Sequence, residues 1–162
     1  MKGGPLPRHG TAQGTNGATH RDDQPLFTRR LPAMPDAVRD TLMALHKRFD
    51  AHIDPDTLGR AELVLAEVLN NIAEHGRSAA GALPFIHLTV IRYLDGLACA
   101  ITDDAAMLPP DLLRGGALPD HDPLPEGGFG WFLIRDLTQE LCYLRENGRN
   151  MLAFRIPPAG HD

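Results

Sequence analysis

Two tight-turn dipeptides constrain the fold of this chain more strongly than any other feature of its sequence. The turns are Asp95-Gly96 and Asn147-Gly148, and the apolar segments beside them are 85–93 and 97–102 for the first and 141–145 and 151–156 for the second. Asp-Gly and Asn-Gly pairs between such segments are typical of two-residue β-hairpin loops. The sequence therefore predicts two hairpins, each made of two antiparallel strands.

Three helices are expected around these hairpins. Residues 35–52 carry apolar side chains at spacings of three and four, and they open with a proline, which suits a first helical turn. Asp54 is placed to cap a second helix that runs to about His75, where Gly76 is a stop signal. A third apolar helix is predicted at 129–139, directly after a run of glycines.

The order of these elements predicts the fold class. A weakly alternating segment, 26–31, adds an edge strand ahead of the helices. The order of helix, helix, hairpin, loop, helix and hairpin favours an α+β fold. We expect a two-layer sandwich of a mixed, mostly antiparallel sheet with helices on one face. A chain of 162 residues is long enough for one such domain, which we place at 26–158.

Two segments rich in glycine and proline lie outside the regular elements. Residues 1–25 have almost no large apolar side chains, so they cannot offset their ordering entropy, and we predict a disordered tail. Residues 103–130 are too long and too rich in proline and glycine for a simple connection. Loops of that kind are usually functional or disordered. We interpret 103–130 as a lid.

Composition excludes several functional classes. The net charge is −5, and the 16 Lys and Arg residues are scattered, so the basic stripe of a nucleic-acid-binding protein is missing. No apolar run approaches the roughly 18 residues that would span a membrane, and no signal peptide is apparent, so we expect a cytoplasmic protein. Both cysteines, Cys99 and Cys142, lie in predicted strands, and we expect buried free thiols rather than a disulfide.

The second helix carries a polar face that suggests chemistry. Glu67, Asn71 and Glu74 lie opposite its apolar arc, and His75 lies at the boundary between the two. A solvated surface is the ordinary interpretation of such a face. However, Asn70-Asn71 places two poor helix formers in the helix interior, which stability alone does not favour. An asparagine oxygen suits Mg²⁺ that also binds phosphate and water, and a glutamate one turn away can accept a proton.

Two further segments are candidates for a ligand site. Three glycines, Gly127, Gly128 and Gly130, precede the third helix, where backbone amides at the positive helix end can bind an anion. By itself such a run is more often only a helix cap. Asp103 and Asp104 follow a predicted strand, and alone they would most often form a turn.

In this order and spacing the segments resemble a known superfamily. Glu67-x-x-x-Asn71-x-x-x-His75-Gly76, a strand that ends in Asp103, and Gly128-x-Gly130 before an apolar helix are similar to the GHKL (histidine-kinase-like) ATPases. Within that superfamily the sequence most resembles the bacterial anti-sigma factor serine kinases. The resemblance covers residues 26–156.

The resemblance implies roles for individual residues. Glu67 matches the catalytic base that activates a serine hydroxyl, and Asn71 matches the ligand of Mg²⁺. Asp103 matches the aspartate that accepts a hydrogen bond from the adenine amino group of ATP. Gly128 and Gly130 match a glycine box whose amides hold the phosphates, and His75 is placed to contact phosphate. The implied cofactors are ATP and Mg²⁺.

The same resemblance implies partners and a reaction. The expected protein binds a sigma factor and phosphorylates a small STAS-type antagonist, and a homodimer is one possible state. The family's first glycine box has glycine where this chain has Ala105. If that position needs a positive φ, the methyl group costs on the order of 1–2 kcal/mol. A catalytically weak partner-binding module is therefore an alternative. Another alternative is a detached ATP-binding domain of a histidine kinase, although no dimerisation helix with a phosphoacceptor histidine is apparent.

Overall fold

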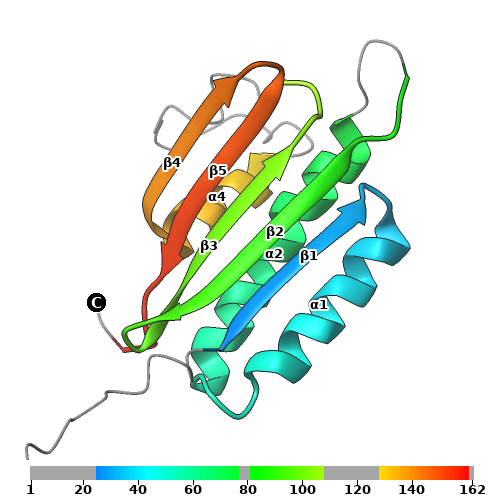
Figure 1. The fold of residues 1–162 in the computed structure, drawn as a ribbon. Helices are drawn as coiled ribbons and strands as arrows, with labels where there is room; N and C mark the ends of the chain where they lie inside the picture. The colour runs from blue at the N-terminus through cyan, green and yellow to red at the C-terminus, as the bar shows by residue number, and fades with distance from the viewer. Residues whose placement is uncertain (1–24, 77–80, 108–127, 161–162) are drawn as a thin grey trace, which may run out of the picture.

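The computed structural model describes residues 25–76, 81–107 and 128–160 (Figure 1). Five strands and three helices lie in these ranges. They are β1 (Leu26–Pro32), α1 (Pro35–Phe49), α2 (Pro55–His75), β2 (Phe85–Tyr93), β3 (Gly96–Asp103), α4 (Gly128–Leu137), β4 (Gln139–Glu146) and β5 (Arg149–Ile156). Residues 1–24 of the predicted tail and residues 108–127 of the predicted lid lie outside the described part of the chain.

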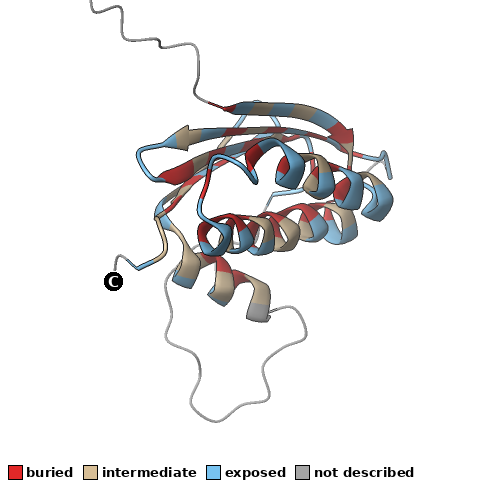
Figure 2. Cartoon of the chain, turned by 90° about the horizontal axis from the view of Figure 1, so that it is seen from below, coloured by how far each residue is buried: buried red, intermediate tan, exposed pale blue. Residues whose placement is uncertain are grey.

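The strands form one sheet in the order β1-β2-β3-β5-β4, and all four strand pairs are antiparallel (Figure 1). The sheet is therefore antiparallel throughout the described residues, without the parallel pair that a mixed sheet would contain. β1 lies at one edge, as expected. All three described helices lie on the same side of the sheet (Figure 2). The predicted α+β two-layer sandwich is confirmed.

The ends of α2 follow the local signals in the sequence. The backbone N–H groups of Asp56 and Thr57 donate to Oδ1 of Asp54, at 3.0 and 3.1 Å. At the other end, the N–H of Gly76 donates to the carbonyl of Ile72 at 2.8 Å. These bonds satisfy backbone groups that a helix terminus leaves open. By contrast, α1 ends at Phe49, three residues earlier than predicted.

The second hairpin forms as predicted. Asn147 and Gly148 both have positive φ, at 50° and 78°, which is the backbone that a two-residue turn of this type requires. They connect β4 and β5 directly, because Glu146 pairs with Arg149.

The first hairpin turns one residue earlier than predicted. Tyr93 pairs with Gly96, so the loop is Leu94-Asp95, and Leu94 has a φ of 53°. Gly96 belongs to β3 instead. A Cβ there would overlap the carbonyl oxygen of Ile156 on the neighbouring strand β5. The glycine is thus explained by close approach of two backbones rather than by the turn.

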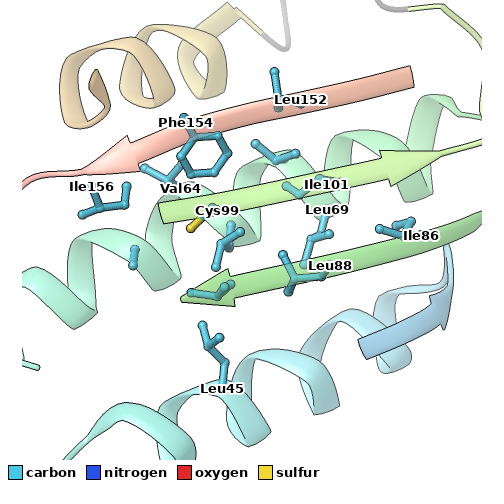
Figure 3. Close-up of a cluster of buried hydrophobic side chains, with 14 of the residues drawn as sticks. Leu45, Val64, Leu69, Ile86, Leu88, Cys99, Ile101, Leu152, Phe154 and Ile156 are labelled. Carbon is cyan, nitrogen blue, oxygen red and sulfur yellow. The ribbon is translucent and has the colours of Figure 1, made fainter. Parts of the chain in front are cut away.

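The hydrophobic core lies between the sheet and the helices. Figure 3 shows Leu45 of α1 and Leu69 of α2 in a cluster of buried apolar side chains with Leu88 and Ile101 of the central strands. Alternate strand residues face this core and the other residues face away from it, which is the period of a sheet covered on one side. Within the described ranges, no helix combines the length and apolarity needed to cross a membrane.

The cysteine prediction is half right. Both thiols are free, but Cys99 is buried in the core and Cys142 is exposed. Burial raises the pKa of Cys99 to about 12. Cys142 pairs with Ala153 on the outer face of the sheet, which the helices do not cover. The prediction that Cys142 is buried is therefore wrong, because an apolar segment at the edge of the sheet still has one exposed face.

Candidate functional site

Three of the expected site residues lie along one side of α2. Glu67, Asn71 and His75 are spaced by four, so they occupy successive helical turns. Glu67 and Asn71 are half-buried and His75 is exposed. The exposed carboxylate of Glu74 lies near His75, with 3.8 Å between Oε2 and Nε2. The apolar residues predicted for the opposite arc are buried in the core; they are Ala61, Val64, Leu65, Val68, Leu69 and Ile72.

The first turn of α4 packs closely against this side of α2. A Cβ added at Gly130 would overlap Oε2 of Glu67 and lie 3.7 Å from Nδ2 of Asn71. A side chain at position 130 would therefore displace the Glu67 carboxylate, whereas glycine leaves it in place. Gly128 begins α4 two residues earlier. The N-terminus of a helix carries partial positive charge and open N–H groups, so the Glu67–Asn71 pair lies beside a region that favours anions.

Two cavities meet at Asn71 and His75. The larger, of about 530 Å³, is lined by Glu67, Asn71, Glu74, His75, Gly130, Phe132 and Leu133. The smaller, of about 150 Å³, is lined by Asn71, Ile72, His75, Gly76, Asp103, Ala105, Ala106, Met107 and Asn150. A cavity of the smaller size can hold an aromatic ring. The structure thus brings six of the seven expected residues to two adjoining cavities. Gly128 lines neither of them.

Asp103 is a buried carboxylate at the end of β3, with 6% of its surface exposed. Its Oδ1 accepts hydrogen bonds from the backbone N–H of Ala105 at 2.9 Å and from Nδ2 of Asn150 at 2.7 Å. Loss of solvation on burial raises the pKa of Asp103, and these two hydrogen bonds only partly oppose that effect. The next residue, Asp104, accepts the backbone N–H of Phe85 at 2.8 Å, so it is tied to β2.

Asn150, which the sequence analysis missed, is the centre of a buried polar network. Its Nδ2 also donates to the carbonyl of Ala106 at 3.0 Å. Its Oδ1 accepts from the hydroxyl of Tyr143 at 2.7 Å and from Nη1 of Arg145 at 2.5 Å. Nη1 of Arg145 donates in addition to the carbonyl of Ala105 at 3.1 Å. The hairpin β4–β5 is thereby fastened to the segment that forms the smaller cavity.

A sequence signal for Asn150 existed. It is in phase with Leu152, Phe154 and Ile156, the residues of β5 that face the core, and only 2% of its surface is exposed. A polar residue at an inward position must find hydrogen-bond partners there. That pattern points to a buried network, although it does not name the partners.

Ala105 is not strained. Its φ lies outside the positive region, so the cost considered for a methyl group at this position does not arise. Ala105 is buried, and its methyl group packs against Gly76. A Cβ added at Gly76 would lie 2.8 Å from that methyl group and would overlap the carbonyl of Ile72. The glycine at the end of α2 therefore makes room for Ala105.

The residues present fit a nucleotide with Mg²⁺. In the described residues, Nδ2 of Asn71 is the one buried side-chain nitrogen or oxygen without a hydrogen-bond partner. Such a donor costs about 1–3 kcal/mol when unpaired, which a phosphate oxygen of a bound nucleotide can recover by accepting from it. Across the same residues, no three His, Cys, Asp or Glu side chains gather into a metal site of their own. A cation at Asn71 would therefore take most of its ligands from phosphate and water, as Mg²⁺ commonly does.

The two-layer α+β fold and the two adjoining cavities fit a nucleotide-binding domain. The chain belongs to the histidine kinase-like ATPase domain family, whose model matches residues 31–156. The expected membership in the GHKL superfamily is confirmed. No curated protein matches the chain by sequence.

The chain is similar to two solved structures, the first of which shares its fold. The RsbU and RsbW domains of Rv1364c from Mycobacterium tuberculosis match with a TM-score of 0.53 and 14% identity, over 83% of this chain and 34% of that chain. A blue-light activated histidine kinase, EL346 from Erythrobacter litoralis, matches with a TM-score of 0.49 and 21% identity, over 67% of this chain and 33% of that chain. This chain spans about a third of the length of each.

Proposed function

We propose that residues 26–158 form the ATP-binding domain of a cytoplasmic serine protein kinase that phosphorylates a STAS-type antagonist and sequesters a sigma factor. One observation carries the proposal. The Glu67 carboxylate and the unpaired amide of Asn71 lie beside Gly130 at the start of α4, in a cavity that adjoins the one formed by Asp103. Membership in the ATPase family supports the binding of ATP. The proposed substrate and partners come from the resemblance to anti-sigma factor kinases.

Each cavity suits one part of the nucleotide. The smaller cavity takes the adenine, whose amino group donates to the Asp103 carboxylate. The larger cavity takes the phosphates, which accept a hydrogen bond from the open amide at Gly130, in the first turn of α4 that Gly128 begins, and lie near His75. Asn71 lies between the two and would supply one oxygen to Mg²⁺. When bound, the cation would supply positive charge that stabilises the phosphates.

Glu67 then acts on the protein substrate. Its carboxylate accepts the proton of the serine hydroxyl as the serine oxygen bonds to the γ-phosphorus. The bond from that phosphorus to the β-phosphate oxygen breaks, and ADP leaves. Positioning and charge stabilisation provide most of the rate in phosphoryl transfer, and proton transfer adds about 10²–10⁴-fold.

A catalytically weak binding module was the alternative, and its main support was a strained Ala105. That strain is absent, so no observation favours the alternative over the kinase.

Phosphorylation of the antagonist with labelled ATP and Mg²⁺ tests the proposal through two variants of α2. Glu67→Gln keeps the size of the side chain but cannot accept a proton, so transfer falls by about 10²–10⁴-fold while ATP affinity stays close to that of the wild type. Asn71→Ala loses Mg²⁺-dependent ATP binding and transfer together. Glu74→Gln is the matched control, because Glu74 is an exposed carboxylate in the same cavity.

The outcomes separate the parts of the proposal. If Glu67→Gln phosphorylates the antagonist as fast as the wild type does, Glu67 is not the base. A wild-type protein that binds ATP but phosphorylates no STAS-type partner contradicts the kinase assignment and leaves the ATPase domain intact. Loss of activity in Glu74→Gln as large as in Glu67→Gln shows that general charge, rather than one base, matters in this cavity.

A further inference from the structure

Arg145 has an unusual place for a charged side chain in this sheet. It is half-buried on the edge strand β4, in phase with Leu141 and Tyr143, which pack against the core. The register therefore turns Arg145 toward the helix side of the sheet, where the smaller cavity lies. An inward charge on an edge strand can serve to block pairing with another strand. That role needs no partner inside the protein, whereas Arg145 has two.

Both partners of Arg145 belong to the wall of the smaller cavity. Its Nη1 donates to Oδ1 of Asn150 at 2.5 Å and to the carbonyl of Ala105 at 3.1 Å. Asn150 and Ala105 line this cavity together with Asp103, whereas Arg145 lines neither the smaller nor the larger cavity. Arg145 can therefore act on a bound nucleotide only through the residues that it holds.

The amide of Asn150 connects Arg145 to Asp103. A guanidinium donates and cannot accept, so it faces the amide oxygen, and the Tyr143 hydroxyl donates to the same oxygen at 2.7 Å. The amide nitrogen lies on the other side, where it donates to Oδ1 of Asp103 at 2.7 Å. Hydrogen bonds in such a chain polarise one another, so the charge of Arg145 strengthens the bond to the Asp103 carboxylate.

This chain of bonds leaves one oxygen of Asp103 for a ligand. Oδ1 already accepts from Nδ2 of Asn150 and from the N–H of Ala105. Within the described residues Oδ2 has no hydrogen-bond partner, and it is not among their fully buried unpaired atoms, so it is accessible from a cavity. Rotation of the carboxylate would break both bonds to Oδ1, and Oδ2 is therefore held in place.

We propose that Arg145 is a positioning residue for nucleotide recognition, which through Asn150 holds the Asp103 carboxylate with Oδ2 free to accept from the adenine amino group. This role rests on the proposed function, because it requires adenine in the smaller cavity. The positive charge of Arg145 also favours the ionised carboxylate, which is a stronger acceptor than the protonated one.

The charges around Asp103 determine where its carboxylate titrates. Burial raises the pKa of Asp103, and its two hydrogen bonds partly oppose that effect. Of the nearby charges, Asp104 raises this pKa and Arg145 lowers it. Further titratable or charged side chains from α2, β1, β2 and β5 share a cavity with Asp103; they are His75, Arg30, His87 and Arg149. Removal of the Arg145 charge therefore raises the pKa of Asp103 further.

Calorimetry of ATP binding to the full chain with Mg²⁺, from about pH 8 to about pH 5, tests this role. Arg145→Met should fold, because each acceptor that Arg145 leaves keeps another donor. Asn150 keeps the Tyr143 hydroxyl, and the carbonyl of Ala105 keeps Nδ2 of Asn150 at 3.4 Å. At neutral pH and above, the variant should bind ATP roughly 5-fold or more weakly, the equivalent of about one hydrogen bond.

The pH profile gives a readout that a merely structural role would not change. As the pH falls, the ATP affinity of Arg145→Met should drop at a higher pH than that of the wild type, because its Asp103 takes up a proton sooner. ATP itself titrates in the same way with both proteins, so the difference between the two profiles belongs to the protein.

Three variants serve as comparisons. Arg145→Lys keeps the charge and should recover most of the affinity and the wild-type pH profile. Tyr143→Phe removes the other donor to Asn150 without a change of charge, so it should leave the pH profile in place. Arg149→Met is the matched charge control and should bind ATP as the wild type does. Arg149 shares a cavity with Asp103, but within the described residues its side chain makes no hydrogen bond or ion pair.

The outcomes distinguish this role from the proposed function. A wild type that binds no ATP overturns both. If the wild type binds ATP and Arg145→Met matches it in affinity and pH profile, the role of Arg145 is overturned and the nucleotide site stands. Arg145→Lys as weak as Arg145→Met, or a profile shifted as far by Arg149→Met, also overturns the assignment to the Arg145 charge. If Arg145→Met does not fold, Arg145→Gln, which keeps an amide donor without the charge, takes its place in each comparison.

Discussion

Asp103→Asn separates the structural role of Asp103 from its role toward adenine. The asparagine keeps an oxygen where Oδ1 now accepts from the N–H of Ala105 and from Nδ2 of Asn150, at 2.9 and 2.7 Å. The network that fastens β4–β5 to this segment therefore survives, and the variant should fold. The other carboxylate oxygen becomes an NH₂ group, which donates and does not accept.

The expected effect on ATP follows from that single change. Two donors, the new amide and the adenine amino group, would face each other in the smaller cavity. A buried polar group left unpaired costs about 1–3 kcal/mol, so ATP should bind roughly 5–150-fold more weakly. Guanine has a carbonyl oxygen at the corresponding position, so GTP should lose less affinity than ATP. Calorimetry with both nucleotides and Mg²⁺ measures this change in preference.

Stability as a function of pH gives a second measurement on the same variant. Burial raises the pKa of Asp103 in the folded protein above its ordinary value of 3.8, so the folded state holds the proton more tightly than the unfolded chain. Stability due to this group is therefore greatest below the ordinary pKa and falls as the pH rises through the raised pKa. Asp103→Asn has no such titration. Its stability relative to the wild type should increase across that window and then stay constant.

Two results would contradict the roles assigned to Asp103. If folded Asp103→Asn binds ATP as tightly as the wild type, with the same preference over GTP, Asp103 does not hold the adenine. If the stability difference between the two proteins does not change with pH, desolvation of the Asp103 carboxylate does not matter to folding.

Three further predictions concern packing and thiol chemistry. Gly76→Ala should destabilise the fold by at least about 2 kcal/mol in urea unfolding, because its Cβ would overlap a backbone carbonyl. Gly59→Ala, with open space around it in α2, should stabilise the fold by about 0.5–1 kcal/mol. Equal effects of the two substitutions would contradict the packing at Gly76. Ala105→Gly should change ATP affinity by less than about 1 kcal/mol, or about 5-fold, since Ala105 has no positive φ; a larger gain by calorimetry would show strain after all. The exposed thiol of Cys142 should react with a disulfide reagent in the native protein. Cys99 should react only on unfolding, because burial raises its pKa to about 12. Rapid reaction of both thiols in the native protein would contradict this prediction.

The sequence by itself determined the regular elements and the side of α2 that carries the candidate site. The Asn147-Gly148 turn, the Asp54 cap and the spacing of Glu67, Asn71 and His75 are each specified within a few consecutive residues. Local backbone preferences and helical periodicity act over that same short distance, so these features can be read from the chain directly. The two-layer α+β class followed from their order.

Only the tertiary structure decided the features that depend on residues distant in the chain. Asn150 meets Asp103 across 47 positions of sequence, and Gly76 makes room for the methyl of Ala105 from the end of a different element. Gly96 is required by the carbonyl of Ile156, although its neighbour Asp95 made it resemble a turn residue. Close packing and burial depend on which surfaces meet in three dimensions. A pattern of consecutive residues does not say which distant residues will lie side by side.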